Sequence, residues 1–161
     1  MRPATEIADT RGRRRFGAAL ACATALAALA AGSAAAGNLA LRTTVDAWST
    51  KLGGDARAVS LAAHQRHPGR MTTAAVKFEH DALAARTATR LRRASSANGA
   101  RAKAIALSAF TAYARAGTSW AASGRARYAH HPVAATAYAR RAAGYVRTGN
   151  RLLVRAGTLL R

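Results

Sequence analysis

The sequence has few acidic side chains and a single cysteine. Against 26 Lys and Arg residues it carries only six Asp and Glu, which gives a formal net charge of +20. Only Asp46, Asp55, Glu79 and Asp81 follow residue 36, so few carboxylates are left for general acid–base catalysis. Cys22 is the only cysteine, which excludes an internal disulfide.

The motifs of common enzyme classes are absent as well. The chain has no G-x-S-x-G, no P-loop, no dinucleotide-binding glycine pattern and no H-E-x-x-H. His64 and His67 have a spacing that suits a metal, but no third ligand lies near them in the sequence. In the run Glu79-His80-Asp81, consecutive residues point to different faces of a helix, and we expect Asp81 to pair with Lys77 at i, i+4 instead. We therefore expect no enzyme, no metal and no cofactor.

What the sequence does have begins with a basic cluster and an apolar run. Arginines crowd residues 11–15, an Ala- and Leu-rich run starts at Phe16, and Ala34 and Ala36 fit the small positions of a cleavage site. These are the three parts of a secretory signal peptide, so we expect residues 1–36 to be removed and residues 37–161 to form the mature domain. The run Arg13-Arg14-Arg15-Phe16 resembles the twin-arginine export signal, with the general secretory pathway as the alternative route.

Two other interpretations of this segment stay open to test. Residues 16–37 are long enough to span a bilayer and would then anchor the protein in a membrane. Their composition is mostly Ala, which partitions poorly into lipid. Cys22 would suggest a lipoprotein, but the apolar run before it is short, so lipidation is not expected. The predicted location is therefore secreted, periplasmic or cell-envelope in a bacterium, with membrane anchoring as the alternative.

Residues 37–161 show helical spacing and no strand-like alternation. Leu41, Val45, Trp48 and Leu52 form one stripe of a helix, which we expect to end at Gly53-Gly54. Asp55 would then be the N-cap of a short second helix that ends before Pro68.

Three further helices are predicted. The third covers about residues 72–94, with Val76, Leu83, Leu91 and Ala94 on one side, and a turn follows at 95–99. The fourth runs to about Ala129, with a bend allowed at Gly117 or Gly124 because glycine weakens a helix. After a turn at 130–132, in which Pro132 suits the first helical position, the last helix extends to near Leu160. The expected fold class is all-α: a small Ala-rich bundle of about five helices after the signal peptide.

The last helix is clearly amphipathic. One face is basic and polar, and the opposite face is Ala-rich with Val146, Leu153 and Leu160. The polar face consists of Thr136, Arg140, Gly144, Arg147, Arg151, Arg155 and Thr158. A solvated surface and a binding face are both consistent with this pattern.

The segment TAYAR occurs twice, at 111–115 and 136–140. The alignment extends further: Trp120 matches Tyr145 and Gly124 matches Gly149. Aromatic residues seven apart share a helix face, so each pair could stack on a ligand or fill an Ala-rich core. We favour the core interpretation, with the tyrosines of both copies pointing inward. The other aromatic residues expected to fill gaps in the core are Trp48, Phe78 and Phe110.

The charge predicts an anionic partner. An excess of Arg is typical of GC-rich genomes, yet the potential it creates still attracts polyanions. We expect a non-catalytic, envelope-associated structural or interaction module that contacts anionic envelope polymers or lipid head groups, with self-association as a further option. The residues expected to make this contact are Arg140, Arg147, Arg151 and Arg155, together with Arg86, Arg90 and Arg93. If the N-terminus is not an export signal, the alternative is a basic helical protein that binds nucleic acid.

Overall fold

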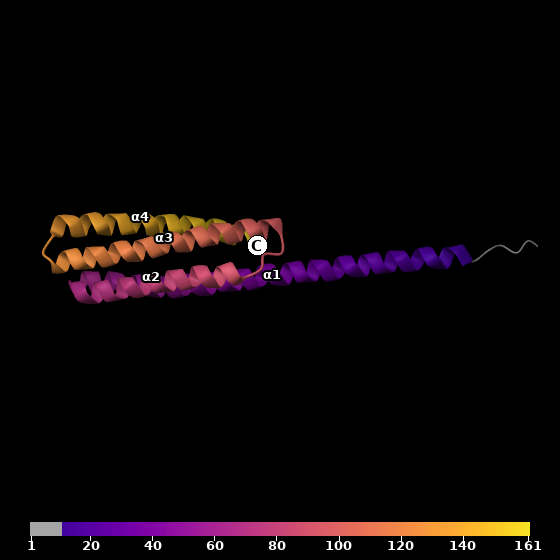
Figure 1. The fold of residues 1–161 in the computed structure, drawn as a ribbon, viewed down its shortest axis with the longest axis horizontal. Helices are drawn as coiled ribbons and strands as arrows, with labels where there is room; N and C mark the ends of the chain where they lie inside the picture. Colours follow the sequence, from indigo (N-terminus) through magenta and orange to yellow (C-terminus); the bar gives the residue numbers. More distant parts are fainter. Residues whose placement is uncertain (1–10) are drawn as a thin grey trace, which may run out of the picture.

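The computed structural model is an all-α four-helix bundle over residues 36–159 (Figure 1). The helices are α1 (Arg11–His64), α2 (Pro68–Leu91), α3 (Ala97–Tyr128) and α4 (Pro132–Leu159). The structure describes side chains from Ala36 to Arg161. The predicted signal peptide 1–36, its twin-arginine-like segment, Cys22 and the alternative anchor at 16–37 therefore lie outside the described residues or at their very edge.

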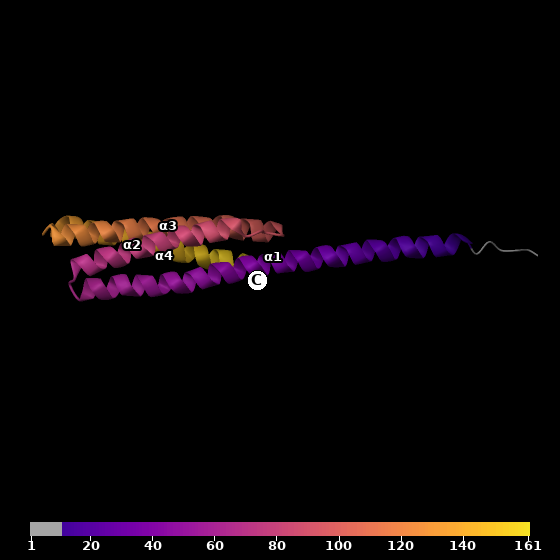
Figure 2. The same ribbon diagram turned by 60° about the horizontal axis from the view of Figure 1, so that its bottom comes forward.

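The helices run up and down and pack mostly on their neighbours in the chain. α2 packs against α1 and α3, and α4 packs mainly on α3, while α1 touches α3 only slightly (Figures 1 and 2). Short connections at residues 65–67, 92–96 and 129–131 join them. Short connections between long helices produce this antiparallel arrangement. α3 is consequently covered on two sides, whereas α4 keeps a free outer face.

The connections use familiar capping chemistry. Pro68 and Pro132 stand in the first turns of α2 and α4, as expected for a residue that has no N–H to leave unpaired. The Gly99 amide donates a hydrogen bond to the Ser96 side chain at 2.9 Å, which caps α3. The predicted turns before α3 and α4 are thus confirmed.

The prediction of about five helices was wrong because Gly53-Gly54 does not end the first helix. Within the described residues α1 continues through both glycines to His64, so that Asp55 is a helical residue and not an N-cap. Each internal glycine costs about 1 kcal/mol. The buried stripe continues past them at Val59 and Ala62, seven and ten residues after Leu52, and this burial holds the helix together.

The side of the helix over 72–94 that carries its large aliphatic residues is not the buried one. Val76 and Leu83 are nearly half exposed and Leu91 is 79% exposed. The buried face of α2 lies elsewhere and consists of Met71, Ala75, Phe78, Asp81, Ala82, Ala85 and Thr89. On that face Met71 and Phe78 fill the core, and the alanines between them let the neighbouring helices come close.

Glycine allows the closest approach between α2 and α3. A Cβ added to Gly117 would lie 2.8 Å from the Glu79 Cα, and one added to Gly124 would lie 3.0 Å from the Pro68 carbonyl oxygen. Real Cβ atoms essentially never come within 3.0 Å of such neighbours. α3 therefore runs unbroken through both glycines because the packing needs them there.

The two TAYAR copies occupy different environments. Tyr113 is buried, its ring makes an edge contact with Phe78 at 5.9 Å, and its hydroxyl donates a hydrogen bond to the Asn150 Oδ1 at 2.6 Å. Burial raises the pKa of Tyr113 to about 12. Tyr138 is 36% exposed and lies under the Arg141 guanidinium instead. The inward prediction is therefore confirmed for Tyr113 and wrong for Tyr138.

Candidate polyanion-binding surface

Charge is distributed very unevenly between the two halves of the bundle. The described carboxylate side chains all lie on α1 and α2, and residues 82–161 contain no Asp or Glu at all. α3 and α4 carry the basic side chains Arg101, Lys103, Arg115, Arg125, Arg127, Arg140, Arg141, Arg147, Arg151 and Arg155. The α3–α4 half is thus a purely cationic surface.

Two carboxylates of the other half, those of Asp55 and Asp81, are neutralised by lysines of the same half. Lys77 donates to Asp55 and to Asp81 at 2.8 Å, and Lys51 lies 3.0 Å from Asp81. Burial opposes the ionisation of Asp81, but the hydrogen bonds from Lys77 and Lys51 outweigh it and hold its pKa below the usual range. Hydrogen bonds from Asp55 and Asp81 raise the pKa of Lys77 in turn. The predicted Lys77–Asp81 pair is confirmed.

The arginines predicted on the last helix form one exposed row, which we call the α4 arginine stripe: Arg140, Arg147, Arg151 and Arg155. Its position follows from the opposite face of α4, where Ala135, Ala142, Gly149 and Ala156 are buried at intervals of seven. At 1.5 Å per residue the stripe is about 22 Å long. Among the described residues, no carboxylate side chain forms an ion pair with any of the four.

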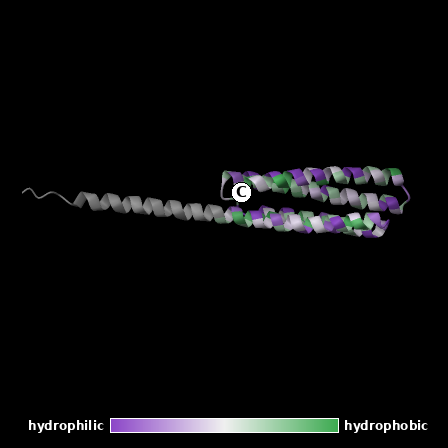
Figure 3. Cartoon of the chain, turned by 180° about the vertical axis from the view of Figure 1, so that it is seen from behind, coloured by the Kyte–Doolittle hydropathy of each residue, from purple (hydrophilic) through white to green (hydrophobic). Residues whose placement is uncertain are grey.

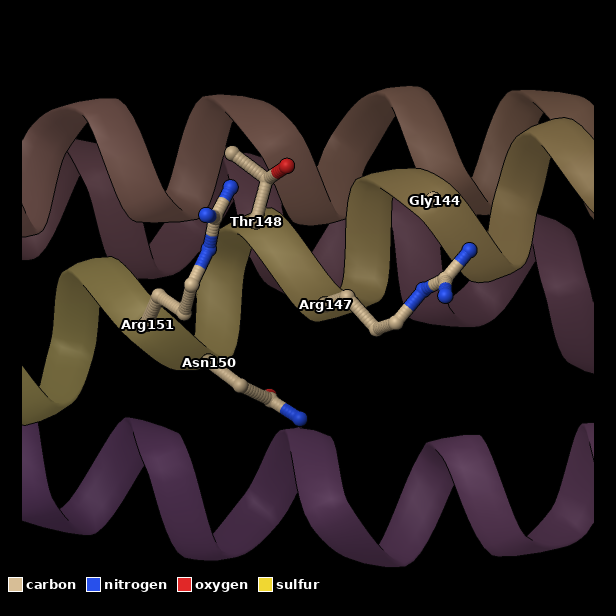
Figure 4. Close-up of a pocket in the computed structure, with 5 residues that line it drawn as sticks. All are labelled: Gly144, Arg147, Thr148, Asn150 and Arg151. Carbon is tan, nitrogen blue, oxygen red and sulfur yellow. The ribbon is translucent and has the colours of Figure 1, made fainter.

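The middle of the stripe borders a hollow of about 520 Å³. Gly144, Arg147, Thr148, Asn150 and Arg151 line it, and Figure 4 shows the two guanidinium groups extending away from the α4 backbone. A Cβ at Gly144 would meet no atom within 4 Å, so the glycine leaves open space beside Arg147. Guanidinium groups bind phosphate, sulfate or carboxylate oxygens in a bidentate way, which makes this hollow suitable for an anionic group.

The second predicted set of arginines lies elsewhere. Arg86 and Arg90 are exposed on α2, but Arg93 follows the end of that helix and belongs to the connection to α3. The expectation that all three share one helix was therefore wrong. In the described part of the chain α2 and α4 do not pack against each other to any extent, so the structure does not join this set to the α4 arginine stripe.

The described helices provide little for a metal or for a membrane span. No group of three or more His, Cys, Asp or Glu side chains comes together between residues 36 and 161 in a way that could hold a metal ion. In the same range no helix offers a stretch long and apolar enough to cross a bilayer, and Figure 3 shows hydrophilic and hydrophobic residues interspersed along the bundle.

One feature of the structure had no signal in the sequence. Residues of the α1–α2 connection, α3 and the α3–α4 connection line a second hollow at one end of the bundle. Its polar residues are Arg66, His67, Arg127 and His130. The two parts are about sixty residues apart in the chain, so neither spacing nor periodicity links them.

Comparison with protein-family models, curated proteins and solved structures found no match to this chain. The case for a function therefore rests on the charges and the geometry described above.

Proposed function

We propose that this protein is an exported, non-catalytic interaction module of the bacterial cell envelope that binds anionic polymers or lipid head groups through the α4 arginine stripe. The observation that supports it most is the exposed row of four arginines on a half of the bundle that contains no carboxylate side chain. Cations without internal partners keep their full attraction for external anions.

The shape of the stripe favours an extended anionic surface or polymer over a compact ligand. Four guanidinium groups spread over about 22 Å of a straight helix meet a row of phosphate, sulfate or carboxylate groups along their whole length. The outer face of α4 is not covered by another helix of the described chain, so a flat partner has access to every arginine. Each basic residue near an anionic surface contributes about 1 kcal/mol of binding free energy.

The test compares two variants of equal net charge. The stripe variant carries Arg140→Gln, Arg147→Gln, Arg151→Gln and Arg155→Gln. The control variant changes four other exposed arginines to Gln: Arg57, Arg101, Arg115 and Arg125. Binding of full-length protein to vesicles with and without anionic lipid, and to an acidic glycopolymer, is measured over a salt titration.

We expect the stripe variant to lose about 100-fold or more in affinity at low salt, and the control variant to lose much less. The salt dependence of the stripe variant should also be flatter than that of the wild type. Equal losses in the two variants would mean that only total charge matters, and the assignment to α4 would then be wrong.

A nucleic-acid-binding protein is the alternative class, because the same cationic half would neutralise a phosphate backbone. Cell fractionation and sequencing of the mature N-terminus discriminate the two. A mature chain that begins at Gly37 outside the cytoplasm supports the envelope function. An intact N-terminus inside the cytoplasm supports the nucleic-acid alternative.

A further inference from the structure

We propose that the hollow at one end of the bundle is a second anion site, which binds a small, multiply charged phosphate compound more tightly as the pH falls. We call it the end cavity. It has a volume of about 670 Å³ and lies where the α1–α2 and α3–α4 connections meet. It contains none of the α4 arginine stripe and does not depend on the function proposed above.

The lining of the end cavity consists of a cationic rim over an apolar floor. Arg66 and His67 come from the α1–α2 connection, Arg127 comes from α3, and His130 comes from the α3–α4 connection. Met71, on the floor, is almost fully buried. Two guanidinium groups and two imidazoles around one hollow provide the donors that phosphate oxygens require.

No carboxylate competes for these cations. Residues 56–78 and 82–161 contain no Asp or Glu, so both connections and all of α3 and α4 are free of acidic side chains. The nearest carboxylate before the cavity in the chain is Asp55, which is held by Lys77. The other titratable or charged groups of these end segments are His64, Arg70, Arg125, Tyr128 and His131. None of them is acidic, so an anion is the missing partner.

The backbone at the rim is left-handed at one residue of each connection. Arg66 (φ 56°) and His130 (φ 55°) are the two non-glycine residues with positive φ in the described chain, and both line the end cavity. The conformation ends each helix, with backbone hydrogen bonds from His67 to Ala62 and from His131 to Ala126. Glycine usually occupies this position, because a side chain there costs stability. Here it is Arg66 and His130 that place a side chain from each connection at the rim.

Histidine makes the site sensitive to pH. Imidazole is the side chain that changes charge between about pH 5 and 8. A histidine gains positive charge when it is protonated, whereas arginine is charged throughout this range. Anion affinity should therefore rise as the pH falls, and the arginines should supply the binding that remains at higher pH.

The test uses trimetaphosphate, a cyclic anion whose charge does not change over this pH range. Its binding to full-length protein is measured by calorimetry at fixed ionic strength, at about pH 5.5 and about pH 7.5. We expect the wild type to bind about tenfold more tightly at the lower pH, because each of the two imidazoles would then add one weak ion pair with the anion. Equal affinity at both pH values would overturn the proposal.

Three variants separate the roles of the rim residues. Arg66→Gly with His130→Gly should raise the midpoint of thermal unfolding, because glycine fits the positive φ, and should lower trimetaphosphate affinity about tenfold or more. The double variant His67→Asn, His130→Asn should bind trimetaphosphate at about pH 7.5 as the wild type does, and its affinity should not rise at about pH 5.5. Arg101→Gln is the control, because Arg101 is exposed near the start of α3, at the other end of that helix from Arg127, and belongs neither to the end cavity nor to the α4 arginine stripe. It should stay within about twofold of the wild type.

The outcomes distinguish binding from a purely structural role. If the glycine variant gains stability but binds trimetaphosphate like the wild type, the positive φ values are structural and the proposal fails. The same holds if Arg101→Gln weakens binding as much as the cavity variants. Phosphatidylcholine vesicles with and without phosphatidic acid then identify the source of the phosphate. If the cavity variants lose affinity for trimetaphosphate alone, the natural ligand is a free phosphate compound. If they also lose affinity for vesicles that contain phosphatidic acid, it is a lipid head group.

Discussion

Replacing Gly117 by alanine places one methyl group where α2 and α3 are in direct backbone contact. The new Cβ would lie 2.7 Å from the Glu79 Cβ and 2.8 Å from its Cα and amide nitrogen. An ordinary van der Waals contact is 3.4–4 Å, and two of these three neighbours are backbone atoms that cannot rotate away. The two helices must therefore separate by roughly 0.6 Å at this level, which loosens the packing around it.

The expected change in the free energy of unfolding is the sum of two opposing contributions. Overpacking a dense interface costs about 1–3 kcal/mol, while alanine gains up to about 1 kcal/mol in helix propensity. The Gly117→Ala variant should therefore be less stable by about 1–2 kcal/mol. At about 4 °C per kcal/mol for a domain of this size, the unfolding midpoint should fall by about 4–8 °C.

Gly144→Ala is the matched control. This glycine also lies inside a helix, but an added Cβ meets no atom within 4 Å. Only the propensity gain remains, so this variant should be more stable by about 0.5–1 kcal/mol. Both variants are measured by urea and thermal unfolding with circular dichroism. If the two alanines stabilise the protein equally, the close approach of α2 and α3 at Gly117 does not exist and the small-residue packing argument fails.

Two further predictions concern the interior of the bundle. Because hydrogen bonds from two lysines hold the pKa of Asp81 below its usual range, its contribution to stability is present above about pH 4 and is lost as the pH falls through the folded-state value. Asp81→Asn should lower the free energy of unfolding by about 1.5–3 kcal/mol at neutral pH and should weaken the dependence of unfolding on acid pH. Asp46→Asn removes an exposed ion pair and should change little. Equal effects of the two variants would contradict the stabilising role of the ion pairs between Asp81 and the two lysines. Leu83→Ser should change stability by less than about 0.5 kcal/mol and Phe78→Ala should cost about 3–5 kcal/mol, measured by urea unfolding. A large loss from Leu83→Ser would contradict the exposed position of this residue on α2.

Helix α2 shows where periodicity is a weak guide in an Ala-rich chain. The largest aliphatic residues, Val76, Leu83 and Leu91, share a side of the helix, yet that side is exposed. The buried face instead combines the large residues Met71 and Phe78 with alanines that let α1 and α3 approach. When many side chains are alanine, both faces are nearly apolar, and hydropathy alone no longer identifies the interior. The fit between the side chains of neighbouring helices then determines which face is buried, and the sequence alone does not show this fit.

The part of the candidate site that lies on a single helix could be predicted from the sequence. The arginines of the α4 arginine stripe share a face of one helix, so spacing alone places them together, and the structure confirms that all four are exposed. Arg93 was misplaced because the end of α2 depends on how the chain turns into α3. The end cavity had no signal, since it requires two connections from different parts of the chain to meet. The binding role of either surface stays a prediction.

The duplicated TAYAR segment contributes to helix packing in both of its copies. Both copies keep a glycine at a packing contact: Gly124 faces Thr72 of α2, and Gly149 faces the ring of Tyr113, which belongs to the first copy. The repeat therefore encodes helix packing. α3 lies between α2 and α4, so the residues after Arg115, such as Ala116 and Gly117, are buried. α4 is at the end of the series and packs mainly on α3, which leaves its outer face to solvent. The four arginines that begin with the last residue of the second copy lie on that outer face.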